Sequence, residues 1–185
     1  MTGSNEVEFN EKVYMLSDLS NDKPSLKRLI ESTRALGGTA IYDALHATLR
    51  RLSKFDARKT VVLLTDGDDT HSQIDYKKIV EEVKGADVVL YTIALGGSFL
   101  DPESRGKLSE LATATGGRYF NASKAKVLES VYSRIADELR SQYYLTYASE
   151  NEKFDGRWIP IQLEVKRKDL EVRSRKGYFA ATPPQ

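Results

Sequence analysis

The stretch Thr60-Val-Val-Leu-Leu-Thr-Asp66-Gly-Asp68-Asp69-Thr70 decides the fold of this chain, because it joins an apolar strand to a cluster of carboxylates. A continuous run of β-branched and aliphatic residues is typical of a strand that is buried on both faces of a parallel sheet. Ligand sites of open α/β sheets lie at the carboxyl ends of strands, which is where Asp66 falls. The stretch therefore predicts an α/β protein with a candidate site at Asp66.

Composition narrows the class of protein. The 185 residues are 40% hydrophobic, which is enough for one domain, or one domain with an appendage, around a sizeable core. With 28 basic and 27 acidic residues the net charge is only +1, so no overall field favours nucleic acid or a membrane surface. No segment approaches the roughly 20 apolar residues of a membrane span. The absence of cysteine excludes disulfides and zinc thiolate sites.

The rest of the first 141 residues predicts alternating strands and helices. Two short strands around Asn10-Glu11 read as an antiparallel hairpin. A helix begins near Pro24, and Thr39 opens the next helix with its hydroxyl free to cap it or to coordinate an ion. The remaining elements are expected as helix 76–84, strand 88–94, a helix through 108–112, strand 118–120 and a long helix over 127–139.

From Gln142 onward the hydrophobic period changes to two. This pattern predicts three strands, at 143–147, 158–165 and 170–173, and places Pro160 at an edge, a bulge or an unpaired position. Their aromatic side chains are expected to pack across strands, or to form a row that binds a partner. We therefore divide the chain into an α/β domain over residues 1–141 and a β-strand extension over residues 142–185.

Several segments carry a family resemblance through their order and spacing. They are Gly37-Gly-Thr39-Ala-Ile-Tyr-Asp43, Leu64-Thr-Asp66-Gly-Asp68, Leu111-Ala-Thr-Ala-Thr-Gly-Gly-Arg118-Tyr-Phe and Lys176-Gly-Tyr-Phe179. Together they resemble a von Willebrand factor A-type domain of the bacterial branch that has a β-rich tail. The resemblance covers nearly the whole chain and implies a Rossmann-like, doubly wound, mostly parallel sheet with flanking helices and a C-terminal β extension. It also implies a non-enzymatic domain that binds proteins.

The resemblance further implies a metal-ion-dependent adhesion site. In that family the site consists of an Asp-x-Ser-x-Ser loop after the first strand, a threonine on a second loop and an aspartate after the fourth strand, and Thr39 and Asp66 match the second and third parts. Mg²⁺ prefers hard oxygen ligands and keeps several waters, so a hydroxyl and a carboxylate suit it. A free coordination position would accept a carboxylate from a partner protein.

The sequence departs from the family pattern at its start. No first strand and no Asp-x-Ser-x-Ser loop precede Val7, and Asp18-Leu-Ser20-Asn-Asp22 lies too close to Thr39 to replace them. The metal site is therefore expected to be incomplete in this chain and its affinity for Mg²⁺ weak. We expect the missing strand to lie upstream or to come from another chain, by strand complementation or in a dimer.

Two other functions remain open. A haloacid-dehalogenase-like phosphatase would use Asp66 as nucleophile and Asp68 as general acid, but Gly96-Gly97-Ser98 stands where its metal-binding carboxylates are needed. A structural scaffold would keep a vestigial metal site and dock a neighbour through the extension. EF-hand calcium binding fails because His71 and Lys77 occupy the positions that require glycine and glutamate.

The candidate residues also have simpler interpretations. Thr39 could serve only as a helix N-cap, and Asp68 and Asp69 are expected to be solvated in a turn. Asp43 could face either the site or the surface, and His71 is expected to be a loop residue without a catalytic partner. The compartment is unknown from the sequence, although resemblance to the bacterial branch favours an exported or cell-surface protein.

Overall fold

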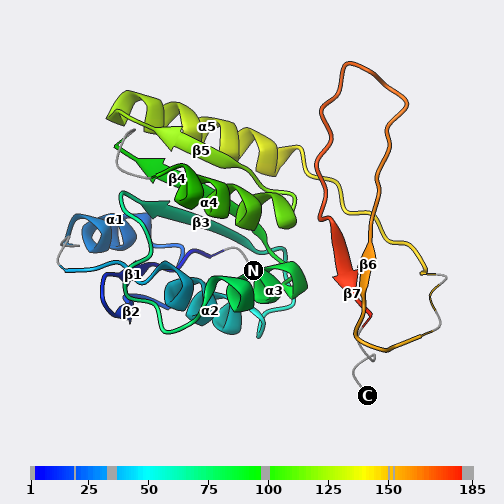
Figure 1. Cartoon of the computed structure of the whole chain (residues 1–185). Coiled ribbons are helices and arrows are strands. Elements are labelled where there is room, and N and C mark those ends of the chain that lie inside the picture. The colour runs from blue at the N-terminus through cyan, green and yellow to red at the C-terminus, as the bar shows by residue number, and fades with distance from the viewer. Residues whose placement is uncertain are drawn as a thin grey trace.

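A computed structural model describes residues 3–18, 20–32, 37–96, 101–149, 151 and 153–180. The elements, shown in Figure 1, are β1 (Val7–Phe9), β2 (Val13–Met15), α1 (Lys23–Ser32), α2 (Ile41–Leu52), β3 (Thr60–Thr65), α3 (Tyr76–Gly85), β4 (Val89–Leu95), α4 (Pro102–Ala114), β5 (Tyr119–Ala122), α5 (Ala125–Arg140), β6 (Trp158–Pro160) and β7 (Gly177–Phe179). Their alternation confirms the predicted α/β fold class. In the described ranges no helix is both long and apolar enough to cross a membrane.

The central sheet is parallel and has the order β3-β4-β5. Its register pairs Thr60 with Val89 and Thr92 with Tyr119. The predicted hairpin is present as the antiparallel pair of β1 and β2, which forms a separate sheet. Within the described part of the chain β3 pairs only with β4, so its other edge has no strand beside it.

Side chains that alternate along β4 divide the core into two layers. Leu90 belongs to a buried cluster with residues of α2, α3 and α4, whereas Ile93 belongs to a second cluster with residues of α5. The same division occurs on β3, where Leu63 packs in the first cluster and Val62 and Leu64 pack against the second. Helices therefore cover both faces of the sheet, as a strand of continuous apolar residues predicts.

The prediction of three strands after Gln142 is wrong in its extent. The structure has only β6 and β7, which pair antiparallel, and residues 143–147, 161–165 and 170–173 are not assigned to strands. The alternating pattern is present, but a strand also needs a neighbouring strand to bond with. Pro160 ends β6 opposite Gly177 in a sheet of two strands, where every strand is an edge, as expected.

Aromatic packing in the extension also differs in part from expectation. Trp158 and Phe179 do pack across the strand pair, with ring centroids 5.0 Å apart in a T-shaped arrangement. Tyr143 and Tyr144 instead lie in solvent, with 90% and 82% of their surface exposed. The division into a domain over 1–141 and an extension over 142–185 stays a prediction.

The extension contacts the body at the end of the sheet where β4 begins. The Lys176 amide donates to the Ala114 carbonyl at 3.3 Å, and Arg173 Nη2 lies 2.6 Å from Glu138 Oε2 on α5. Arg118 Nη2 donates to Glu171 Oε1 at 2.7 Å. We call this region the base, and Figure 1 shows the extension standing beside the body there.

Candidate metal and ligand site

Two loops meet at the carboxyl end of β3. The Thr39 carbonyl, just before α2, accepts the amides of Thr70 at 2.8 Å and His71 at 3.1 Å, and the Thr39 amide donates to Thr70 Oγ1 at 3.0 Å. A Cβ placed on Gly67 would lie 3.4 Å from the Thr39 hydroxyl oxygen. The Thr39 hydroxyl is thus next to the residue that follows Asp66. We call these two loops, residues 37–40 and 66–75, the carboxyl edge.

The Thr39 hydroxyl does not cap α2, so the N-cap interpretation is wrong. The cap position belongs to Ala40, which offers no side-chain hydrogen bond. Asp69 Oδ2 and Ser72 Oγ each accept the Tyr42 amide at 3.0 Å, because the loop after β3 supplies acceptors from outside the helix. In the part of the chain that the structure describes, the Thr39 hydroxyl makes no hydrogen bond and so is free for another ligand.

Asp69 and Asp43 tie the two loops together from opposite sides. Besides Tyr42, Asp69 accepts the Ser72 hydroxyl at 2.6 Å and the Ser72 amide at 3.2 Å. In return, Asp43 on α2 accepts the amides of Gln73 and Ile74, each at 3.0 Å. The expectation of a solvated Asp69 is therefore wrong, and Asp43 faces the carboxyl edge. Both carboxylates are occupied by backbone and hydroxyl donors.

Asp66 and Asp68 differ from that pair because neither has a hydrogen-bond donor among the described residues. Asp66 is exposed, and no group in the described ranges donates to its carboxylate. Asp68 is half-buried, and its Oδ1 is buried without a partner, so the expectation that it is solvated is also wrong. A buried oxygen without a donor is costly unless water or an ion satisfies it. The carboxyl edge thus has one exposed and one sheltered free carboxylate.

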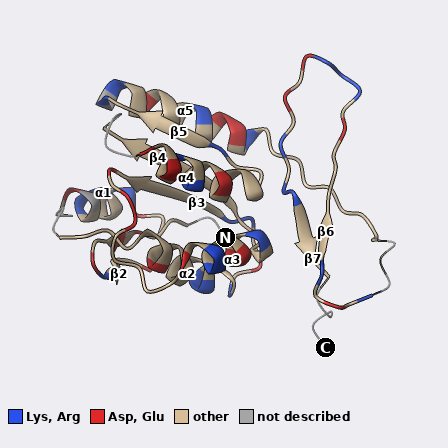
Figure 2. Ribbon diagram, in the orientation of Figure 1, with Lys and Arg blue, Asp and Glu red and all other residues tan. Residues whose placement is uncertain are grey.

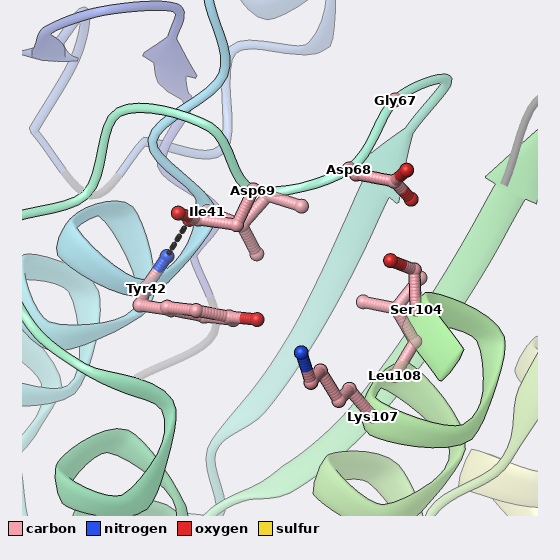
Figure 3. Close-up of a pocket in the computed structure, with 8 residues that line it drawn as sticks. All are labelled: Ile41, Tyr42, Gly67, Asp68, Asp69, Ser104, Lys107 and Leu108. Carbon is pink, nitrogen blue, oxygen red and sulfur yellow. Dashed lines mark hydrogen bonds between the residues drawn. The ribbon is translucent and has the colours of Figure 1, made fainter. Parts of the chain in front are cut away.

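The sheltered carboxylate lines a small pocket between the loop after β3, the start of α2 and α4, drawn in Figure 3. The lining residues are Ile41, Tyr42, Gly67, Asp68, Asp69, Ser104, Lys107 and Leu108. Figure 3 shows the Asp68 carboxylate near Ser104 and the Lys107 ammonium turned toward the hydroxyl end of Tyr42. This arrangement puts hydroxyl and carboxylate oxygens on one side of the pocket and a cation on the other.

The charge state of the pocket is set by its neighbours. A hydrogen bond from Lys107 to Glu103, at 2.6 Å, raises the pKa of the Lys107 ammonium. Burial raises the pKa of the Tyr42 hydroxyl, and burial followed by the bond to Glu110 raises that of Tyr76. The lysine is therefore charged and the tyrosines neutral near pH 7. None of the three is a base at that pH.

The rival sites lack what they need. The ring of His71 is exposed, and its Nδ1 lies 2.9 Å from Thr70 Oγ1, a hydroxyl that also accepts the Thr39 amide. Among the described residues no group of three or more His, Cys, Asp and Glu side chains could hold a metal ion. Gly96 ends β4 where a phosphatase needs carboxylates, and Gly97-Ser98 lie outside the described residues. A purely protein-built metal cage is therefore not formed by the described acidic and histidine side chains.

A doubly wound α/β domain with oxygen-bearing loops at the carboxyl end of its sheet belongs to the class of open-sheet ligand-binding domains. A family profile described as the von Willebrand factor type A domain matches residues 4–134. The chain belongs to this family.

Individual relatives are much longer than this chain. It is 30% identical over 132 residues to calcium-activated chloride channel regulator 1 of Bos taurus, a match that covers 68% of this chain and 14% of that protein. It is 25% identical over 124 residues to integrin alpha-M of Mus musculus, covering 63% and 11%. The chain therefore spans only a small part of the length of these relatives.

A solved structure has the same fold. Proximal thread matrix protein 1 of the mussel byssus, described with a zinc-occupied MIDAS motif, superposes with a TM-score of 0.60 at 22% identity. The match covers 74% of this chain and 34% of that one. At this identity the likeness shows the fold.

Proposed function

We propose that this chain binds a protein ligand through a divalent cation held by Thr39 and Asp66. The observation that carries the proposal is the approach of the Thr39 hydroxyl to Gly67, beside the exposed Asp66 carboxylate, where neither group has a hydrogen-bond partner among the described residues. A hydroxyl and a carboxylate are hard oxygen donors of the kind that Mg²⁺ prefers. The profile match and the metal-bearing motif of the mussel protein support this proposal.

The two residues fit Mg²⁺ in kind but supply few of its ligands. Mg²⁺ coordinates six oxygens and keeps several waters, so the remaining positions belong to water and to a carboxylate of the partner protein. Asp43 and Asp69 do not compete for the ion, because their oxygens accept hydrogen bonds that hold the loops together. Affinity for the ion alone is therefore weak, because two protein ligands offset little of the cost of removing water from Mg²⁺.

The same geometry favours binding over catalysis. The Thr70 hydroxyl beside His71 accepts the Thr39 amide and so joins the two loops, and the pocket lysine is charged. We infer that the ligand is held without a bond being made or broken. Turnover of an aryl phosphate that disappears in the Asp66→Ala variant would contradict this and favour the phosphatase.

Paramagnetic broadening by Mn²⁺ tests the site directly. We expect Mn²⁺ to broaden the amide signals of Thr39, Asp66 and Gly67, excess Mg²⁺ to reverse the effect, and Asp66→Ala or Thr39→Val to abolish it. Asp56→Ala is the matched control, because Asp56 is an exposed aspartate before the start of β3. Broadening that is the same in all variants, or centred elsewhere, would refute the assignment. Micromolar Mg²⁺ binding would contradict the weak affinity.

A further inference from the structure

The extension exposes an unusual amount of apolar surface. Nine of the twelve large hydrophobic residues that are exposed in the described chain lie between residues 143 and 172. They are Tyr143, Tyr144, Leu145, Tyr147, Phe154, Leu163, Val165, Leu170 and Val172, with exposed fractions from 40% to 90%. Exposed apolar side chains gathered in one region of a chain often mark an interaction site.

The backbone of the same segments is also unpaired. The ladder of β6 and β7 continues by one bond, from the Ile161 amide to the Lys176 carbonyl at 2.9 Å. Beyond it, within the described residues, segments 162–175 and 142–149 make no backbone-to-backbone hydrogen bond. Unpaired extended backbone is a template for another strand.

The exposed side chains follow a strand pattern. Leu163 and Val165 alternate with Gln162, Glu164 and Lys166. Segment 143–147 repeats the pattern through Tyr143, Leu145 and Tyr147, and segment 170–173 through Leu170 and Val172. Residues two apart on an extended chain lie on one face, so each segment has an apolar face ready to pack.

Contacts to the body hold this surface in one orientation. Glu138 on α5 lies close to Arg173, and Arg118 donates a hydrogen bond to Glu171. These contacts fix segment 170–173 to the base. The Ser149 and Tyr178 hydroxyls hydrogen-bond at 2.5 Å, which ties segment 142–149 to β7. Ordering of a strand acceptor before binding lowers the entropy that binding must overcome.

We propose that segments 143–147, 162–166 and 170–173 form a strand-acceptor surface that pairs with an extended segment of a partner protein. The partner segment alternates apolar side chains with acidic ones. Backbone groups decide the class of partner, because lipid or the side of a helix would cover the apolar faces but leave the amides and carbonyls unpaired. The surface is at the base, so it is a site distinct from Thr39 and Asp66.

Charge decides the composition of the partner. Lys166 and Lys168 form no ion pair within the described residues, and Figure 2 shows basic residues at the tip of the hairpin. Among the acids of this hairpin, Asp169 already pairs with Arg167 and Glu171 with Arg118, and Glu164 accepts the Gln162 side-chain amide at 2.7 Å, so a second copy offers no acid there that lacks a partner. An acidic strand therefore complements the surface better than the chain itself does.

Hydrogen exchange with synthetic peptides tests the proposal. The probe alternates valine with threonine and glutamate, and its controls replace glutamate by lysine or scramble the order. We expect the acidic peptide to protect amides in 143–147, 163–165 and 170–172, with about tenfold tighter binding than either control at low salt. Added salt should reduce the difference in affinity between the acidic peptide and the lysine peptide, because salt screens the charges. Equal protection by all three peptides, or none, overturns the proposal.

Variants and two further probes separate the alternatives. Leu163→Lys and Val172→Lys each place a charge on a side chain that is 40% exposed, so folding is unaffected and peptide protection is lost. Tyr132→Lys, on a residue 44% exposed on α5, is the matched control and leaves binding unchanged.

Two further measurements test the alternative partners. Protection that rises with protein concentration, together with a dimer in sedimentation, would overturn the proposed partner, and so would protection by lipid vesicles. Asp66→Ala should leave peptide binding intact. A failure of the proposed metal site can therefore be told apart from a failure of the strand-acceptor surface.

Discussion

The carboxyl edge and the base of this domain are built in opposite ways. At the base, a Cβ on Gly117 would lie 1.9 Å from the Leu90 carbonyl oxygen, and one on Gly116 would lie 2.7 Å from the Ser174 carbonyl carbon. At the carboxyl edge, a Cβ on Gly67 would meet only the Thr39 hydroxyl, at 3.4 Å. Backbone packs closely on backbone at the base, whereas at the edge two backbone bonds and several side-chain hydrogen bonds join the loops and leave other oxygens without a donor among the described residues. Tight backbone packing is thus concentrated at the base, and the oxygens that suit a metal ion at the carboxyl edge.

The largest expected difference comes from alanine at these glycines. Gly117→Ala should lower the free energy of unfolding by about 3 kcal/mol or more, because the Leu90 carbonyl cannot move without breaking the sheet. Gly67→Ala should cost less than about 1 kcal/mol, since its neighbour is at ordinary contact distance. Urea unfolding followed by circular dichroism measures both. Similar losses at the two positions would show that the ends are equally packed.

A pH titration probes the base through Tyr91. Burial, and then the Glu138 carboxylate, raise the pKa of the Tyr91 hydroxyl from 10.0 to about 12. Between these values the unfolded state loses the proton while the folded state keeps it, so the stabilisation present below pH 10 is lost as pH rises toward 12. The loss is about 2 kcal/mol, and Tyr91→Phe should remove it from the alkaline unfolding profile. An unchanged slope in this variant would contradict the link.

Removing the tie between the loops should affect the edge alone. Asp69→Ala takes acceptors from the Tyr42 amide and from Ser72, which should cost about 1–2 kcal/mol. Asp68→Ala, the control, removes a carboxylate without a donor and should change stability by less than about 0.5 kcal/mol. Amide exchange at Tyr42 should accelerate only in the first variant. Faster exchange across the base as well would mean that the two ends unfold as one unit.

The smallest expected effect concerns the attachment of the extension. Arg173→Met removes an ion contact to Glu138, in which the side chains are 28% and 20% exposed, and should cost about 1 kcal/mol. Segment 142–149 should then be cleaved faster by proteases. Arg140→Met is the control, since Arg140 is 77% exposed and pairs only with Asp137 on its own helix. Cleavage at the wild-type rate in both variants would show that other contacts hold the extension.

Local sequence predicted the helices and strands of the body well, because each of these elements depends on residues that are close together in the chain. The apolar run of 60–65 and the helical spacing of 41–52 each concern neighbours in the chain, and each became the element expected. It also located Thr39 and Asp66 at the ends of those elements. It missed Asp69, because the atoms that this carboxylate binds on Tyr42 are 27 residues away. The spacing of Asp69 and Ser72 was a usable signal, since aspartate often bonds backbone amides shortly after itself.

The sequence by itself determined the family, the order of helices and strands, and the position of each candidate ligand along the chain. Only the tertiary structure decided that Asp43 and Asp69 accept hydrogen bonds from the neighbouring loop and helix. It also decided that, within the described ranges, the Thr39 hydroxyl beside Gly67 makes no hydrogen bond and residues 143–147 have no strand beside them. Periodicity records which face of a segment is apolar. It does not record which distant backbone will bond to that segment, because hydrogen bonds between segments form only when the fold brings them together.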